Sequence, residues 1–289
     1  MSYLCTEDII LPDGHISPLM NDRLRQAEQT IMDLDLSQHR VFITAGANGI
    51  GRETALRFRE EGAHVAICDI DSDALEEMRK HDPEIWTAEC DVGDSTALTA
   101  TISNAISALG GLDCLVNNAG TAGPTARFED IDDAAWNHTL NICLSSQFFA
   151  AKAAIQALRQ SANPSILNLS SAAGRFGFAM RSPYAAAKWG VIGLTKTLAI
   201  ECGEDGIRVN AILPGFVAGD RQRRVMEAKS QQRGISFEQI EQEAFSYSSI
   251  KDYVTATHIA DQILFLASSR GRMISGQMLN IDGDTKMLA

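Results

Sequence analysis

The chain has 289 residues, a formal net charge of −12 and a sequence pI near 4.9. This length suits one large α/β domain with a sizeable core better than two small domains. The negative charge argues against nucleic acids and anionic membranes as partners, because both are themselves polyanionic.

The cysteine and histidine patterns argue against two kinds of site. The six cysteines form no Cys-x-x-Cys pair and several lie inside apolar runs, which favours buried thiols in a reducing cytoplasm over a disulfide framework. The six histidines show no pair at metal-ligand spacing, so we predict no metal site.

No apolar run reaches the ~18 residues of a membrane span, and the first residues do not resemble a signal peptide. We therefore expect a cytoplasmic protein.

Residues 1–37 differ from the rest of the chain and are predicted to form an N-terminal extension. Three interpretations stay open. The segment is a flexible extension, or an arm that packs on a neighbouring subunit, or Met32 is the physiological start.

The first strand and helix enclose a glycine-rich turn. The apolar run 41–43 predicts a buried strand, residues 44–51 (Thr-Ala-Gly-Ala-Asn-Gly-Ile-Gly) a turn, and 52–61 a helix that stops before Gly62. Glycines in such a turn let the backbone approach a pyrophosphate, and the helix directs its free N-terminal amides at it. This unit predicts a dinucleotide site.

The next strand, 64–68, leads to Asp69. An acidic residue about 20 positions after the glycines accepts a hydrogen bond from a ribose hydroxyl and would repel a 2′-phosphate. Asn48 offers no positive charge to such a phosphate. We therefore predict NAD rather than NADP as the cofactor.

Strands and helices continue to alternate toward the C-terminus, which predicts a Rossmann-type doubly wound parallel sheet in a single α/β domain over 38–289. The exception is 218–253, which is polar and irregular and has the size of a lid over a substrate, with helical patches at 223–232 and 237–245. Further helices are predicted over 71–80, 95–109, 132–159, 183–201 and 256–267, and further strands over 85–90, 112–116, 166–169, 209–213 and 276–283.

Tyr184 and Lys188 lie four residues apart on the predicted helix 183–201, so they share a face. An ammonium group beside a phenol lowers the phenol's pKa, which makes Tyr184 a candidate proton donor or acceptor for an alcohol or carbonyl oxygen. Ser171, at the end of the preceding strand, could hold the same oxygen. Tyr-x-x-x-Lys alone is also typical of an exposed tyrosine over a lysine on a helix surface. The motifs in the rest of the chain therefore have to distinguish a catalytic pair from a surface pair.

Taken in order, these motifs resemble those of the classical short-chain dehydrogenase/reductase family over residues 38–286. The resemblance is carried by five pieces: Thr-x-Gly-x-x-Gly-x-Gly at 44–51, Asp91-Val92, Asn-Asn-Ala-Gly at 117–120, Ser171 with Tyr184 and Lys188, and the turn Pro214-Gly215.

The resemblance implies that Tyr184 is the general acid/base and that Ser171 binds the substrate oxygen. Lys188 would lower the pKa of Tyr184 and contact the nicotinamide ribose. Hydride would pass between NAD and a secondary alcohol or ketone. The implied NAD contacts are Gly46, Asn48, Gly49, Ile50, Gly51, Asp69, Asp91, Val92, Asn118, Ala119, Gly120, Tyr184, Lys188, Pro214, Gly215 and Val217.

The chain departs from the family pattern at two positions. Ala45 replaces the usual first glycine, and we expect Gly46 to restore the turn. Cys143 stands where the family usually has an Asn of a proton relay, and Asn141 is rotated by about 200° from it on a helix. We hypothesise that a water on the backbone carbonyl of residue 143 serves the relay, more slowly; a rate gain in Cys143→Asn would support this, and a loss would count against it.

The substrate is predicted to be a small hydroxylated compound (a sugar, polyol or hydroxy acid) rather than a steroid or long acyl chain, because the lid is polar. Arg175 and Arg181, in the loop that resembles the family's substrate segment, either bind a carboxylate or phosphate or are solvated. The lid carries three more arginines, Arg221, Arg223 and Arg224. They would also suit an acidic or polyhydroxylated substrate, or they are solvated or pair with Glu227 or Glu241 on the surface.

The main prediction is an NAD-dependent oxidoreductase. The alternative is a nucleotide-sensing binding protein of the same fold with little turnover, which Cys143 favours and the intact Ser171, Tyr184 and Lys188 disfavour. The resemblance also implies a homotetramer in which alanine-rich helices near 141–159 and 183–203 pair between subunits.

Overall fold

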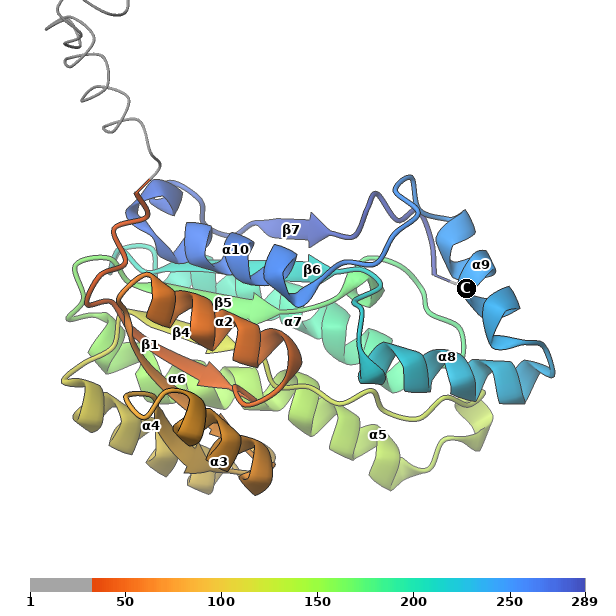
Figure 1. Cartoon of the computed structure of the whole chain (residues 1–289), viewed down its shortest axis with the longest axis horizontal. Helices are drawn as coiled ribbons and strands as arrows, with labels where there is room; N and C mark the ends of the chain where they lie inside the picture. Colours follow the sequence, from red (N-terminus) through yellow and green to blue (C-terminus); the bar gives the residue numbers. More distant parts are fainter. Residues whose placement is uncertain (1–32, 289) are drawn as a thin grey trace, which may run out of the picture. The chain divides into compact units, whose positions relative to one another are not determined.

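A single parallel sheet organises the chain, as predicted (Figure 1). The computed structural model describes residues 33–288, and most of the predicted extension over 1–37 lies outside the described residues. In the described part, the seven strands are β1 (Arg40–Thr44), β2 (His64–Asp69), β3 (Trp86–Glu89), β4 (Cys114–Asn117), β5 (Ser165–Leu169), β6 (Arg208–Pro214) and β7 (Met278–Ile281).

The strand order is β3-β2-β1-β4-β5-β6-β7, so the direction of winding reverses between β1 and β4. Val41 of β1 pairs with Val65 on one side and with Cys114 on the other. All these pairings are parallel, so the carboxyl ends of the strands meet at one edge of the sheet. In open α/β sheets the ligand binds outside that edge, at the point of reversal.

Helices cover both faces of the sheet because its strands are apolar on both sides. On one face, α2 (Gly49–Glu60) packs against α10 (Ala256–Ala267); on the other, α4 (Ser95–Leu109) packs against α6 (Ser146–Leu158), and α7 (Ser182–Glu201) packs on β6. At the sheet edge, α3 (Ser72–His81) covers β2 and β3. The core between the sheet and the pair α4 and α6 includes the fully buried Phe42, Leu98, Ile102, Leu115, Ala150, Ala154 and Ile166.

The helix predicted over 132–159 is interrupted. It consists of α5 (Asp133–Leu140), the π-helical turn η3 (Asn141–Ser145) and then α6. A π-helical turn holds one extra residue, and such turns are frequent at functional sites. The prediction was right about the location of the helix and did not include the π-helical turn, which contains Cys143.

Two helices follow β6, where the sequence predicted helical patches. They are α8 (Asp220–Arg233) and α9 (Phe237–Ser246), and the second begins with a capping box between Ser236 and Gln239. Their apolar residues Met226 and Ile240 form a buried cluster with Ala172 and Ala173, which directly follow β5. The two helices are therefore anchored over the segment that carries Ser171.

Candidate active site

The three residues predicted to be catalytic lie together at the carboxyl edge of the sheet. Ser171 follows β5, and Tyr184 and Lys188 lie on the first two turns of α7. The Lys188 Nζ atom is 5.7 Å from the centroid of the Tyr184 ring. Lys188 is almost fully buried and donates a hydrogen bond of 2.6 Å to the Leu169 carbonyl, which fixes its ammonium group beneath the ring.

The surroundings of Tyr184 lower its pKa below the usual value of 10. Burial of the phenol acts in the opposite direction, but the charges of Lys188 and Arg221 and a hydrogen bond from Ser171 outweigh it. The phenolate is thus more accessible near neutral pH than in a free tyrosine.

A buried amide that the sequence did not single out supports this arrangement. Gln147 donates through Nε2 to the carbonyls of Cys143 and Leu169, both at 3.2 Å. The Leu169 carbonyl therefore accepts from both Lys188 and Gln147. Sequence spacing gives no signal for the contact with Leu169, because the two residues are 22 positions apart and meet only in the folded chain.

The Cys143 thiol holds the loop after β4. Its Sγ accepts a hydrogen bond from the Thr121 amide (3.3 Å) and donates one to the Thr121 carbonyl (3.4 Å). A Cβ atom placed on Gly120 would lie 3.7 Å from this Sγ and 3.6 Å from Lys188 Nζ, so the thiol faces the reacting groups. Asn141 instead donates to the Gly93 carbonyl at 2.8 Å, which agrees with the expectation that it points elsewhere.

The glycine turn after β1 fits a pyrophosphate. Gly49 begins α2 with open space above its Cα, and the side chain of Asn48 caps none of the first amides of the helix. These amides are the donors that a helix N-terminus offers to an anion. A Cβ atom on Gly51 would lie 2.1 Å from the Ala45 carbonyl oxygen, so only glycine fits there.

The expectation that Gly46 restores the turn was wrong. Gly49 and Ala45 take the left-handed conformation in this turn; Ala45 does so itself, with φ of +51°, which costs a residue with a Cβ roughly 1–2 kcal/mol. Gly46 has a different role: a Cβ atom there would lie 2.6 Å from Ile67, so it lets the turn approach β2 closely.

Asp69 lies at the end of β2, beside the glycine turn, as the sequence predicted. It is buried, and its carboxylate accepts hydrogen bonds from the amides of Ala47 (3.0 Å) and Asp71 (3.2 Å). Asn48 donates to Asp71 at 3.2 Å. The negative charge of Asp69 is therefore held rigidly at the position where an adenosine ribose is expected.

Asn118, predicted to contact the cofactor, uses its side chain to support the turn. Its Nδ2 donates to the carbonyls of Thr44 (3.0 Å) and Ala45 (2.9 Å), while the Thr44 hydroxyl accepts from the amides of Asn118 and Ala119, each at 3.0 Å. Thr44 thus joins β1 to β4 at the point of strand reversal.

The remaining predicted contacts also lie beyond the carboxyl ends of strands. Asp91 and the buried Val92 follow β3, and the Asp91 carboxylate accepts from the Gly93 amide at 2.8 Å. Gly215 follows β6, where a Cβ atom would lie 2.7 Å from the Asp282 Cα. Of the other predicted residues, Ile50 is in α2, Gly120 follows β4, Pro214 ends β6 and Val217 pairs with Val254.

The predicted substrate-loop and lid arginines divide into two groups. Arg175 and Arg223 are largely exposed; Arg175 lies 3.9 Å from Asp282, and Arg223 pairs with Glu227 at 2.9 Å. Arg181 and Arg221 instead lie next to the Tyr184 ring. Nearby, burial and the charge of Arg181 lower the pKa of Lys229 to about 8.

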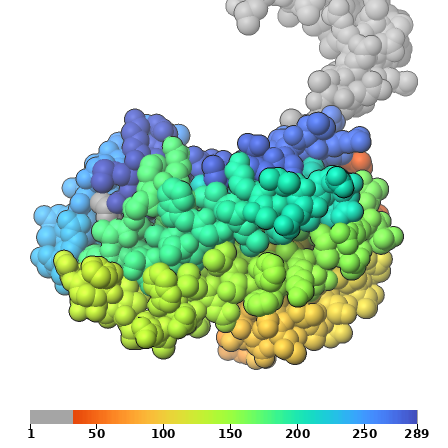
Figure 2. Space-filling view, turned by 180° about the vertical axis from the view of Figure 1, so that it is seen from behind, coloured from red at the N-terminus to blue at the C-terminus, as the bar shows by residue number. Residues whose placement is uncertain are grey.

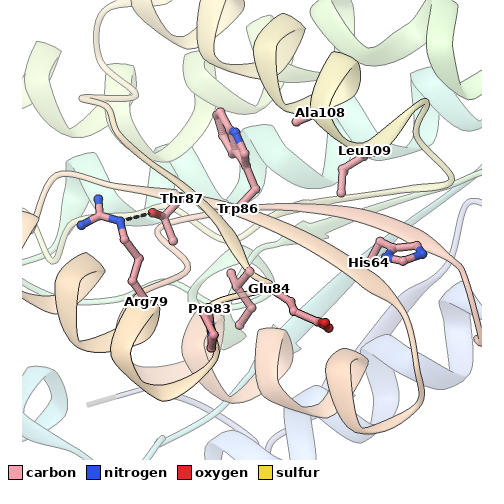
Figure 3. A pocket seen from close by; sticks show the side chains of 9 residues that line it. His64, Arg79, Pro83, Glu84, Trp86, Thr87, Ala108 and Leu109 are labelled. Carbon is pink, nitrogen blue, oxygen red and sulfur yellow. Dashed lines mark hydrogen bonds between the residues drawn. The ribbon is translucent and has the colours of Figure 1, made fainter.

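A separate hollow of about 620 Å³ lies at the opposite end of the strands (Figure 3). His64 and Trp86, at the amino ends of β2 and β3, line it, and Arg79 donates to Thr87 there at 2.6 Å.

Residues 33–288 hold no group of three His, Cys, Asp or Glu side chains that could bind a metal ion. None of their helices is long and apolar enough to cross a membrane.

Comparison with known proteins assigns a family to this site. Residues 44–284 match a family model described as enoyl-(acyl carrier protein) reductase. The chain belongs to the short-chain dehydrogenase/reductase family. Members of this family are oxidoreductases that bind a nicotinamide cofactor, and the chain's relatives act on alcohols and ketones.

Two relatives illustrate the similarity. Trans-4-hydroxycyclohexanecarboxylate dehydrogenase of Sinomonas cyclohexanicum is 37% identical over 255 residues, covering 83% of this chain and 90% of that protein. Levodione reductase of Leifsonia aquatica is 30% identical over 252 residues, covering 84% of this chain and 92% of that protein. A solved levodione reductase structure matches with a TM-score of 0.80 at 30% identity, covering 86% of this chain and 97% of that one.

Proposed function

We propose that this protein is an NAD-dependent oxidoreductase that interconverts a secondary alcohol and the corresponding ketone. The observation that carries the proposal is Tyr184, whose pKa is lowered by Lys188 and which receives a hydrogen bond from Ser171. An acid/base group tuned toward neutral pH at a ligand-binding edge is typical of a catalytic site.

In the oxidation direction, the Tyr184 phenolate takes the proton of the substrate hydroxyl. Ser171 donates a hydrogen bond to the same substrate oxygen and so orients it. Lys188, held by the Leu169 carbonyl, stabilises the phenolate before the reaction and would contact the ribose of a bound nicotinamide. The cofactor would supply the acceptor for the hydride of the carbinol carbon. In the reduction direction, Tyr184 returns the proton to the substrate oxygen.

The preference for NAD rests on Asp69. Its carboxylate would accept from a ribose hydroxyl and repel a 2′-phosphate. The glycines at 46, 49 and 51, with the amides of α2, would hold the pyrophosphate, and Val92, Ala119 and Val217 would lie along the rest of the cofactor. The buried thiols at 68, 90, 114, 143 and 202 support a reducing, cytoplasmic location.

We infer that the substrate is a small hydroxylated compound, a sugar, polyol or hydroxy acid. Two features support this class. The helix α8 is rich in charged residues, so the lid over the site is polar. The relative from Sinomonas is named for a compound that bears both a hydroxyl and a carboxylate.

The test is a substrate panel followed at the absorbance band of reduced nicotinamide. The protein is mixed with NAD or NADP and with sugars, polyols, hydroxy acids and a steroid. We expect reduction of NAD by one class of small alcohol and a rate lower by about 10²–10⁴-fold in Tyr184→Phe. Tight NAD binding with no turnover across the panel would contradict the proposal and favour the nucleotide-sensing alternative.

A further inference from the structure

Arg181 is a buried arginine beside the catalytic ring with an unpaired charge. It is 2% exposed, and its Cζ lies 5.2 Å from the Tyr184 ring centroid and 5.3 Å from that of Phe178. Its Nη2 donates to the Ala122 carbonyl, but across residues 33–288 neither Nε nor Nη1 reaches an acceptor. Burying a charged group with free donors is unfavourable unless a counter-charge arrives, so this arrangement favours an anionic ligand.

The backbone holds Arg181 in this place at a cost. Met180, the preceding residue, has a φ of +62°, which a side chain with a Cβ rarely adopts. Two hydrogen bonds fix the segment: the Met180 carbonyl accepts from the Ala126 amide (3.0 Å), and the Arg181 amide donates to the Phe178 carbonyl (3.2 Å). Strain of this kind persists where the surrounding structure imposes it, and it clusters at ligand-binding sites.

A second guanidinium lies over the same ring. The Cζ of Arg221 is 5.8 Å from the Tyr184 centroid, and its two Nη atoms donate to the carbonyls of Gly120 (3.2 Å) and Thr121 (2.9 Å). Between residues 33 and 288, neither Arg181 nor Arg221 forms an ion pair with a carboxylate. In a chain with a net charge of −12, this is a local concentration of positive charge at the substrate side of the site.

We propose that Arg181 binds a carboxylate of the substrate, so that the substrate is a hydroxy acid and the product an oxo acid. Nε and Nη1 are the atoms of this guanidinium that have no protein acceptor, and a carboxylate oxygen supplies both the acceptor and the counter-charge that such a donor needs. Ser171 and Tyr184 then hold the reacting oxygen at the other end of the molecule. This assignment rests on the proposed function, since it concerns the substrate of the same site.

The test compares acids with their neutral methyl esters. Lactate, 3-hydroxybutyrate and 4-hydroxypentanoate place the carboxylate progressively further from the carbinol carbon. Each acid and its ester is titrated calorimetrically into the protein–NADH complex and is assayed with NAD. We expect one acid to bind more tightly than its ester and to have the higher kcat/KM, with the preference reduced about 30- to 100-fold in Arg181→Met, mainly through KM.

The matched control is Arg175→Met, which removes an exposed arginine from the same loop and should leave the acid-to-ester ratio unchanged. Arg181→Lys, which keeps the charge, should retain part of the preference even if Arg181→Met does not fold. An equal loss for acid and ester, with a shifted pH profile for the ester, would show that Arg181 only supports Tyr184 and would overturn the proposal.

Four further outcomes of this test also support or overturn the assignment of Arg181. Equal binding of acids and esters by the native protein overturns the inference, as does tighter binding of a hydroxyalkyl phosphate than of every acid. Turnover of neutral alcohols alone overturns the inference and leaves the proposed function intact. Arg181-dependent binding of an acid without turnover supports the inference and contradicts the proposed function.

Discussion

At the scale of single residues, the site depends on a backbone carbonyl that holds a catalytic side chain in place. The Leu169 carbonyl fixes Lys188. Burial raises the pKa of Tyr184, but the charge of Lys188, with Arg221 and the Ser171 hydrogen bond, lowers it overall. Sequence spacing was sufficient to predict that Tyr184 and Lys188 converge, because one helical turn separates them. It was insufficient for Gln147, whose hydrogen bond to the Leu169 carbonyl joins residues 22 positions apart, and for Ala45, where backbone geometry rather than residue type decided which residue takes a positive φ.

Cys143 illustrates the same limit. The family pattern identified its position, but its two hydrogen bonds to Thr121 follow only from the path of the loop after β4. The thiol therefore has a structural role in addition to its place beside Lys188. The hypothesis that the relay runs more slowly with Cys143 stays a prediction.

At the scale of elements, the end of β2 determines the charge that a cofactor ribose meets. The sequence placed Asp69 there because strand, turn, helix and strand follow one another at the spacing of a dinucleotide-binding unit. The boundaries of α9 agree with the predicted patch, since a capping box marks its start, whereas α8 begins at Asp220, before the predicted 223, and has no side-chain cap. The sequence could not show that the Asp69 carboxylate accepts hydrogen bonds from the backbone amides of Ala47 and Asp71.

We predict that Asp69→Asn raises the ratio of NADP to NAD efficiency by about tenfold, which corresponds to ~1.4 kcal/mol of removed repulsion. Asparagine keeps one of the two acceptor oxygens, so it can retain the shorter hydrogen bond from the Ala47 amide and loses only the longer one from Asp71, and the turn should stay folded. The readout is kcat/KM with each cofactor. Asp73→Asn, on exposed α3, makes the same change in net charge and should leave the ratio unaltered. An unchanged ratio in Asp69→Asn would mean that another group selects the cofactor.

At the scale of the whole molecule, α6 and α7 form much of one face, where their residues lie side by side (Figure 2). Three large apolar side chains on these helices are exposed, Phe148 at 45%, Trp189 at 51% and Ile200 at 81%. Large exposed apolar side chains on two helices of one face favour an interaction surface there. We therefore propose that the predicted homotetramer forms through this face, with the helices of two subunits packed together.

We predict that light scattering coupled to size exclusion finds an oligomer for the native chain and a smaller species for the double variant Phe148→Glu, Trp189→Glu. Two buried carboxylates would be unpaired in the interface, which is strongly unfavourable. Ile70→Glu, at an exposed site after β2, serves as the control and should not change the mass. A monomeric native chain, or an unaffected double variant, would contradict this interface.

The central claim, that Lys188 prepares Tyr184 for proton transfer, is tested most directly by the pH dependence of alcohol oxidation. The phenolate is the active form in this direction, so the rate should rise with pH and level off above the pKa of Tyr184, which lies below 10. Lys188→Met removes the charge that favours the phenolate, so the inflection should move to higher pH and the rate near neutrality should fall. Lys196→Met, an exposed lysine two turns further along α7, should leave the profile unchanged. An inflection at the same pH in Lys188→Met would show that Tyr184 is not the titrating base.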